Sequence, residues 1–344
     1  MVGDMAGMDR KLFEAVHSGD VPVMRRLIER GGADVNQRDG NDMTLLHFAA
    51  AEGQLEAVRT LAELGADKDA QNVEGATPLH YAAYQGHTDV MTALVELGAN
   101  KEAKDANGLT PFHMAVHRAE EEVMTTLAQL GADVNSRTPD GATPLHWAAS
   151  HGKVELVTKL AQLGADKEAR DENEMTPLHL AAAHGNVELV TKLAQLGADK
   201  EARNENEMTP LHLAAAHGQV QVLTTLVELG ADKEAWARRK MTPLHLAACK
   251  GHAEAVSTLL DLGADKRPRT TEGETPLKMS MRFGHLKVEQ LLKEIKTKKA
   301  ASEPTQQAVD EAERVALEIL EEEEREEAAK AEAAAQKQKK VREL

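Results

Sequence analysis

Residues 176–202 read TPLHLAAAHGNVELVTKLAQLGADKEA, and this stretch holds the start and end signals of two helices. Thr176 is a good N-cap residue and Pro177 suits the first helical position, so a helix is predicted to begin there. From Leu178, apolar residues recur at i, i+3 and i+4, and the small alanines among them allow a second helix to come close. Gly185 is predicted to end this first helix.

The second half of the stretch predicts another helix. Asn186 can cap it, and leucines follow at i, i+4 and i+7 from Leu189. Gly197 then suits the left-handed residue that commonly follows a helix. The polar residues after it are predicted to form a turn or hairpin that leads to the next threonine.

The Thr-Pro-Leu-His segment, or a close variant, recurs every 33 residues without insertion. It begins at Thr44, Thr77, Thr110, Thr143, Thr176, Thr209, Thr242 and Thr275. A fixed period of this length indicates a solenoid whose units contact only their neighbours. The repeated residues are therefore predicted to be structural, and function is expected where the copies differ.

On these motifs the chain resembles the ankyrin-repeat family, whose pattern T-P-L-H-x-A-A-x-x-G-H-x-x-x-V-x-x-L-x-x-x-G-A-D is similar to residues 176–199 along its whole length. The resemblance implies an all-α, ankyrin-repeat α-solenoid of helix-turn-helix units with hairpin fingers. We also expect a C-terminal helical extension after the repeats. The resemblance further implies a concave groove, lined by the first helices and the fingers, that binds another protein.

We divide the chain into nine repeats with an extension at each end. The N-terminal capping repeat, residues 8–41, lacks Thr-Pro and has one extra residue between its two halves. Seven internal repeats span 42–272, and a C-terminal capping repeat, with Lys278 in the histidine position, spans 273–297. Residues 1–7 are expected to be disordered, 298–304 to be a linker and 305–344 to be a charged helix.

Composition limits the function classes. The formal net charge is -16, which disfavours nucleic acid and anionic membranes as partners, because phosphate binding needs clustered Lys and Arg. Aromatic residues are only 2% of the chain, and the single cysteine suits a reducing compartment. No signal peptide or membrane-spanning run is evident. The expected location is cytoplasmic, with a nuclear one also open.

Histidine is the most obvious candidate for chemistry, because the chain has 15. The resemblance implies that the motif histidines hydrogen-bond within the turn and to the adjoining repeat, as structural residues. These motif positions include Thr77, His80, Thr143, His146, Thr176, His179, Thr209, His212, Thr242 and His245. His113 and His117 have zinc-ligand spacing, but without H-E-x-x-H or a third ligand no metal is expected.

No enzyme is predicted. The sequence shows no nucleophile paired with a base and no phosphate-binding loop, so no catalytic residue, cofactor or small-molecule substrate is expected.

A binding site is predicted around the repeat that begins at Thr242. The positions of this repeat that correspond to groove-facing positions in ankyrin repeats carry Trp, Arg, Met and Lys. This is the composition of a binding hot spot, and the methionines can adapt to different partners. The predicted partner-binding residues are Trp236, Arg238, Arg239, Met241, Lys250, Met208, Met175, Arg282 and Phe283. They predict a partner protein with acidic and apolar side chains. The alternative is that Trp236 only covers the neighbouring finger.

Three other features allow more than one interpretation. Tyr81 and Tyr84 make a second candidate surface, although Tyr81 lies at a position that is usually packed. In the repeat at Thr110, Ala119 replaces the turn glycine, which indicates either a contact or drift. The recurring GADKEA segment predicts ladders of opposite charge between repeats, through Lys68, Lys101, Lys167, Lys200 and Lys233.

We expect a monomeric, non-enzymatic interaction module or scaffold that holds a partner protein in the groove. The alternative is an assembly or tethering protein whose charged C-terminal helix binds the partner or blocks the groove. Heptad spacing in that helix lasts under two heptads, too short to predict a sustained coiled coil. The acidic run EEEEREE at 321–327 could lie on the basic residues near Trp236.

Overall fold

The computed structural model describes residues 9–302. The predicted disordered start and the charged helix 305–344 lie outside the described residues. By its internal contacts the chain divides into two units, Met1–Glu289 and Gln290–Leu344, and the boundary falls within the last helix of the C-terminal capping repeat.

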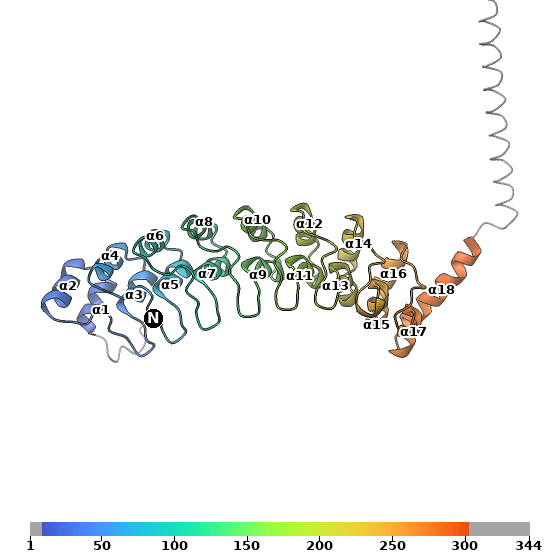
Figure 1. Cartoon of the computed structure of the whole chain (residues 1–344), viewed down its shortest axis with the longest axis horizontal. Helices are drawn as coiled ribbons and strands as arrows, with labels where there is room; N and C mark the ends of the chain where they lie inside the picture. Colours follow the sequence, from blue (N-terminus) through green and yellow to red (C-terminus); the bar gives the residue numbers. More distant parts are fainter. Residues whose placement is uncertain (1–8, 303–344) are drawn as a thin grey trace, which may run out of the picture. The chain divides into compact units, whose positions relative to one another are not determined.

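Every described repeat contains two antiparallel helices, and the all-α prediction is confirmed (Figure 1). The N-terminal cap contributes α1 (Arg10–His17), α2 (Val21–Arg25) and the π-helical η1 (Arg26–Arg30). The first helices of the later repeats are α3 (Leu45–Ala51), α5 (Pro78–Gln85), α7 (Pro111–Arg118), α9 (Pro144–Ser150), α11 (Pro177–His184), α13 (Pro210–His217), α15 (Pro243–Lys250) and α17 (Pro276–Arg282). The second helices are α4 (Leu55–Glu63), α6 (Thr88–Glu96), α8 (Glu121–Gln129), α10 (Val154–Gln162), α12 (Val187–Gln195), α14 (Val220–Glu228), α16 (Ala253–Asp261) and α18 (Leu286–Ser302).

The Thr-Pro motif starts each first helix by a reciprocal cap. Thr176 is extended, with φ -94° and ψ 164°, and its side chain lies against the backbone of His179 while the His179 ring accepts from the backbone N–H of Thr176. Two of the orphan N–H groups at the helix start are thereby satisfied. At the other end Gly185 takes φ +79°, a conformation that glycine adopts without steric cost.

Stacking buries the apolar stripes of both helices. In Figure 1 the first helices follow one side of the repeat array and the second helices the other, while the fingers project beyond the first helices. Each first helix packs on the first helix of the next repeat. Leu178, Ala181 and Ala182 are fully buried there, as are Leu189 and Leu193 on the second helix. No unit could bury these side chains alone, which is why the array is needed.

The fingers are tight turns joined to one another. Within the described residues there is no strand, and the bridges Arg38↔Thr44 and Ala237↔Met241 are isolated. Neighbouring fingers share one backbone hydrogen bond, such as Glu205 N–H to Asn173 O at 3.0 Å. These bonds link turns 33 residues apart into an edge that is interrupted between the fingers before α7 and α9.

Both capping repeats differ from the sequence-based expectation. The extra residue of the N-terminal cap lies within its second helix as the π turn η1, where Gly31 N–H donates to Arg26 O at 3.1 Å. It does not lie between the two halves, because a π turn absorbs one residue without shifting the packed stripe. At the other end α18 continues to Ser302 through residues 298–302, which were expected to be linker. Two lysines and two alanines in that segment favour helix over linker.

Candidate functional site

The motif histidines make two hydrogen bonds each along most of the array. In the repeat at Thr176, the backbone N–H of Thr176 donates to Nδ1 of His179 at 3.1 Å, and Nε2 lies 2.9 Å from Met208 O in the next repeat. Since Nδ1 accepts and the carbonyl can only accept, Nε2 carries the proton and the ring is neutral. Burial lowers the pKa of His179 to about 4. These rings are structural links and have no free nitrogen for chemistry.

His113 departs from this pattern. It is buried, yet its Nε2 has no hydrogen-bond partner among the described residues. The neighbouring finger has also changed, because Pro139 stands where other fingers supply the donor N–H. The helix pair α7 and α9 packs less closely than α11 and α13. The junction between the repeats at Thr110 and Thr143 is therefore the least tightly joined of the internal ones.

Trp236 lies on the finger before α15 and is 52% exposed. The ammonium of Lys240 stands 5.0 Å from the centre of its ring, within cation–π range. Its carbonyl accepts a hydrogen bond from Arg203 Nη1 of the preceding finger at 3.1 Å. The backbone of this residue is held in place, and its indole ring is left half open to solvent.

The same finger concentrates positive charge and backbone strain. Arg238, Arg239 and Lys240 are consecutive and exposed, and they form the short 3-10 turn η2. Arg239 and Lys240 both have positive φ, 61° and 57°, where other fingers place glycine or a single acidic residue. The guanidinium of Arg239 pairs with Glu272 at 3.2 Å. Strain of this kind clusters at binding sites, where the surrounding fold holds it.

The remaining predicted binding residues differ in how open they are. Met175, Met208 and Met241 are half-buried, and the sulfur of Met175 accepts from Asn204 Nδ2 at 3.3 Å. Lys250 is exposed at the end of α15. Arg282 lies 5.7 Å from the ring centre of Phe283 and pairs with Glu274 at 3.2 Å. Phe283 itself is 49% exposed.

The irregular repeat at Thr110, which the sequence left between contact and drift, meets aromatic residues of both neighbouring repeats. Arg118 of α7 stands over the ring of Tyr84 of α5 at 5.2 Å. Trp147 of α9 lies 5.3 Å from His117 of α7 and stacks on His151 at 4.1 Å between ring centres. These five residues come from three consecutive repeats. Their identities were visible in the sequence, but their meeting depends on the stacking.

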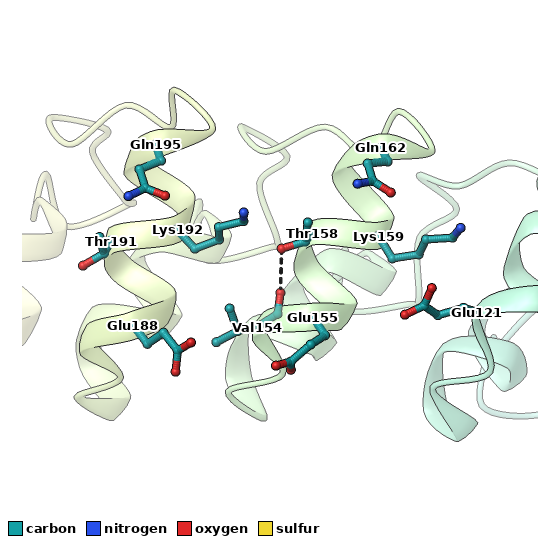
Figure 2. A pocket seen from close by; sticks show the side chains of 10 residues that line it. All are labelled: Glu121, Val154, Glu155, Thr158, Lys159, Gln162, Glu188, Thr191, Lys192 and Gln195. Carbon is teal, nitrogen blue, oxygen red and sulfur yellow. Dashed lines mark hydrogen bonds between the residues drawn. The ribbon is translucent and has the colours of Figure 1, made fainter.

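A shallow pocket lies on the opposite side, over the second helices (Figure 2). It has a volume of about 520 Å³ and lies over α8, α10 and α12, with lysines, glutamates and amides around it. No predicted partner-binding residue lines it. In Figure 2 the long polar side chains extend along the helix surfaces and do not converge on a common point. This arrangement offers no recognisable chemistry.

The predicted charge ladders are wrong for the described residues. None of the five GADKEA lysines forms an ion pair there. Instead the glutamate that follows the lysine accepts a backbone N–H from the next repeat, as Glu168 does from Asp199 at 2.9 Å. Lys101 donates to the carbonyl of Leu130 at 3.0 Å.

Among the described residues, no group of three or more His, Cys, Asp or Glu could hold a metal ion. No helix in that part of the chain is long and apolar enough to cross a membrane.

Fold and surface together define a solenoid of helix-turn-helix repeats with linked fingers. The chain belongs to the ankyrin-repeat family, because the family model "Ankyrin repeats (3 copies)" matches residues 12–105, 99–171, 163–237 and 234–302. Members of this family are generally protein–protein interaction modules and typically lack enzymatic activity.

Individual relatives agree with this assignment. The chain is similar to the crystal structure of the ankyrin repeat domain of Bcl-3, a member of the IkappaB protein family, with 30% identity and a TM-score of 0.59. That match covers 64% of this chain and 98% of the other. The chain is also 44% identical over 54 residues to the E3 ubiquitin-protein ligase Ufd4 of Drosophila melanogaster. This segment is 16% of the chain but only 2% of the length of Ufd4.

Proposed function

We propose that the protein is a non-enzymatic interaction module that holds a partner protein on its first helices and fingers. The binding energy would be concentrated on the finger before α15. The observation that carries this proposal is the half-exposed Trp236, set beside three consecutive basic residues in a chain of net charge -16. Tryptophan and arginine are the side chains most enriched at energetic centres of interfaces.

The partner would present acidic and apolar side chains together. Arg238 and Lys240 form no ion pair among the described residues, although Arg238 Nη1 lies 3.5 Å from Asn206 Oδ1. An incoming carboxylate could therefore pair with them without breaking an existing ion pair. An apolar side chain beside it would cover the open part of the Trp236 ring.

The test compares two variants of the full chain in affinity capture from native extract. Trp236→Ala with Arg238→Glu and Arg239→Glu should lose the captured protein, because it removes the ring and reverses the charge. Val73→Ala, on an equally exposed finger, should retain it. Circular dichroism establishes that both variants are folded. Unchanged capture by the triple variant would contradict the site.

The C-terminal tail enters the same experiment as a further variant. A chain in which Glu321, Glu322, Glu323 and Glu324 are glutamine keeps its length and loses the acidic run. Tighter capture by this variant would support the alternative function, in which the tail competes for the finger. Unchanged capture would leave the finger as the sole determinant.

A further inference from the structure

One register position of the first helices carries an unusual series of side chains. It is the last position before the turn of each repeat, and from the fourth to the eighth repeat every occupant bears a basic or imidazole nitrogen. These residues are Arg118, His151, His184, His217 and Lys250, and we call them the helix-end stripe. Earlier repeats have Glu52 and Gln85 at this position. All five stripe residues are exposed.

The three histidines of the stripe share one orientation. Nδ1 of His184 lies 2.8 Å from Leu180 O in its own helix, and Nδ1 of His217 lies 2.9 Å from Leu213 O. His151 makes the same contact with Trp147 O at 2.8 Å. Because a carbonyl can only accept, Nδ1 carries a proton in each ring. Nε2 makes no hydrogen bond among the described residues, and it becomes a donor when the ring takes up a second proton.

We propose that the helix-end stripe is a docking surface for an extended acidic segment of a partner protein. This proposal rests on the proposed function, because the bound molecule is again a protein. The proposed surface, however, lies at the helix ends and not at the Trp236 finger. Charge complementarity carries it, since five consecutive repeats of an acidic chain present nitrogen in the same register. A carboxylate can pair with Arg118 and Lys250, and between them it can accept from Nε2 of any histidine ring that carries a proton on both nitrogens.

The spacing selects the form of the occupant. Packed helices lie ~8–10 Å apart, so successive stripe residues are separated by about that distance. An extended or polyproline II segment advances ~3.1–3.3 Å per residue, and every third side chain therefore falls opposite the next repeat. A helix advances only ~1.5 Å per residue and would need six or seven. The partner is an extended segment with acidic residues at i, i+3, i+6 and onward.

One end of the stripe has an anchor. Arg118 is held over Tyr84, which is 38% exposed, and His151 stacks on Trp147. Arg118 also lies 3.8 Å from Glu120, a long pair between exposed groups that an incoming carboxylate can replace. Clustered Tyr, Trp and Arg supply apolar contact area at a place where charge alone would bind weakly. This anchor spans the loosely joined junction of α7 and α9.

The test uses a synthetic probe with fixed geometry. Fluorescein-labelled (Glu-Pro-Pro)5 adopts a polyproline II helix that carries one carboxylate per turn, ~9.3 Å apart on one face. A peptide of five glutamates followed by ten prolines has the same composition and charge without that spacing. Anisotropy titrations with the full chain at low ionic strength should show at least fivefold tighter binding of the spaced peptide.

Variants of the full chain locate the binding. His151→Gln, His184→Gln and His217→Gln together should weaken the spaced peptide at least fivefold. Lys159→Gln with Lys192→Gln, which removes charge from the second helices, should leave it unchanged. Trp236→Ala should also leave it unchanged, so a failure of the stripe is distinguishable from a failure of the finger site. Equal affinity for both peptides, or no effect of the triple variant, would overturn the proposal.

Two other occupants are outcomes of the same experiment. If glutamine at residues 321–324 tightens probe binding, the chain's own tail fills the stripe, and the assignment to a separate partner is overturned. If a single-stranded oligonucleotide binds more tightly than the spaced peptide and the triple variant abolishes that binding, the stripe recognises phosphates instead.

Discussion

The repeats at Thr176 and Thr209 form a regular region, and the repeat at Thr110 joined to its successor forms an irregular one. In the regular region His179 bonds Met208 O, and Asn173 O receives the next finger's N–H. In the irregular junction both links are missing, since His113 Nε2 has no described acceptor and Pro139 has no N–H. Apolar packing and side-chain bonds hold the two irregular repeats together, such as Lys104 Nζ to Arg137 O at 2.9 Å and Asp166 N–H to Asn135 Oδ1 at 2.7 Å.

The comparison separates two contributions to an ankyrin junction. Apolar burial is kept at the irregular junction, where Phe112 and Leu145 are as buried as Leu178. The helices α7 and α9 nevertheless pack less closely than α11 and α13, and two directional bonds are missing between their repeats. Junctions without those bonds are expected to open locally more often, because local stability follows the number of contacts that cross a boundary.

The largest effect should come from acid. Burial lowers the pKa of His47, His113, His179 and His212 to about 4, against ~6.5 in an unfolded chain. The unfolded state then binds protons more readily, so the free energy of unfolding is highest above pH ~6.5 and falls as the pH drops toward 4. From pH 7 to 5 the loss should total several kcal/mol, on the order of 1 per histidine.

Urea unfolding followed by circular dichroism measures this loss. Hydrogen exchange at pH 5 shows where the loss begins, because amides of α7 and α9 should lose protection before those of α11 and α13. A midpoint that does not move between pH 7 and 5 would refute the assignment of neutral buried rings.

The next largest effect should come from removing a motif histidine, and the loss of stability should differ between the two regions. His179→Ala leaves the Thr176 N–H and the Met208 carbonyl unpaired, at a cost of ~2–4 kcal/mol. His113→Ala loses only the contacts on its Nδ1 side, and its cost should be lower by at least ~1 kcal/mol. Urea midpoints of the full chain provide the measurement. The exposed His184→Ala serves as the control, and equal losses at 179 and 113 would argue against the difference in bonding.

The turn after the first helix gives a pair of opposite substitutions. Ala119 has φ +57°, so Ala119→Gly should raise the free energy of unfolding by up to about 1 kcal/mol. Gly185→Ala should lower it by about 1–2 kcal/mol, because a Cβ there overlaps with Gln219 Oε1 as well as straining φ. Thermal midpoints reveal the sign. Two changes of the same sign would contradict the strain argument.

The smallest effect should come from removing a side chain that accepts a backbone N–H from the next repeat, and it should be equal in the two regions. Glu168 accepts from Asp199 N–H at 2.9 Å in the regular region, and Asn135 accepts from Asp166 N–H at 2.7 Å beside the irregular one. Both acceptors are exposed, so Glu168→Ala and Asn135→Ala should each cost ~0.5–1 kcal/mol. A clear difference between their urea midpoints would show that the irregularity extends to the second helices.

The fold could be predicted because its signals are local. Thr176, Pro177 and Gly185 set the helix ends within ten residues, and the period of 33 determines how units stack. The candidate site was predicted less completely. The sequence predicts an exposed Trp236. The position of the Lys240 ammonium over its ring depends on a strained turn for which the sequence has no motif.

Contacts between repeats were the hardest to predict. Trp147 and His117 are 30 residues apart and meet only after two helices have stacked. The sequence of the repeat at Thr110 alone left its irregularity between contact and drift. The partner of each GADKEA glutamate was also missed, since an exposed backbone amide leaves no sequence signal. Whether either surface binds a partner stays a proposal for the experiments above.

Every motif histidine except His113 donates to a carbonyl 29 residues later, and this gives the array a polarity. A chain shortened from its N-terminus loses donors and leaves carbonyls that water can satisfy. A chain cut after an internal repeat leaves the motif histidine of its last repeat without the carbonyl acceptor of the next repeat. The final repeat escapes this difficulty by carrying the exposed Lys278 at the histidine position. Growth by duplication can therefore insert units anywhere upstream, while the terminal unit must remain last.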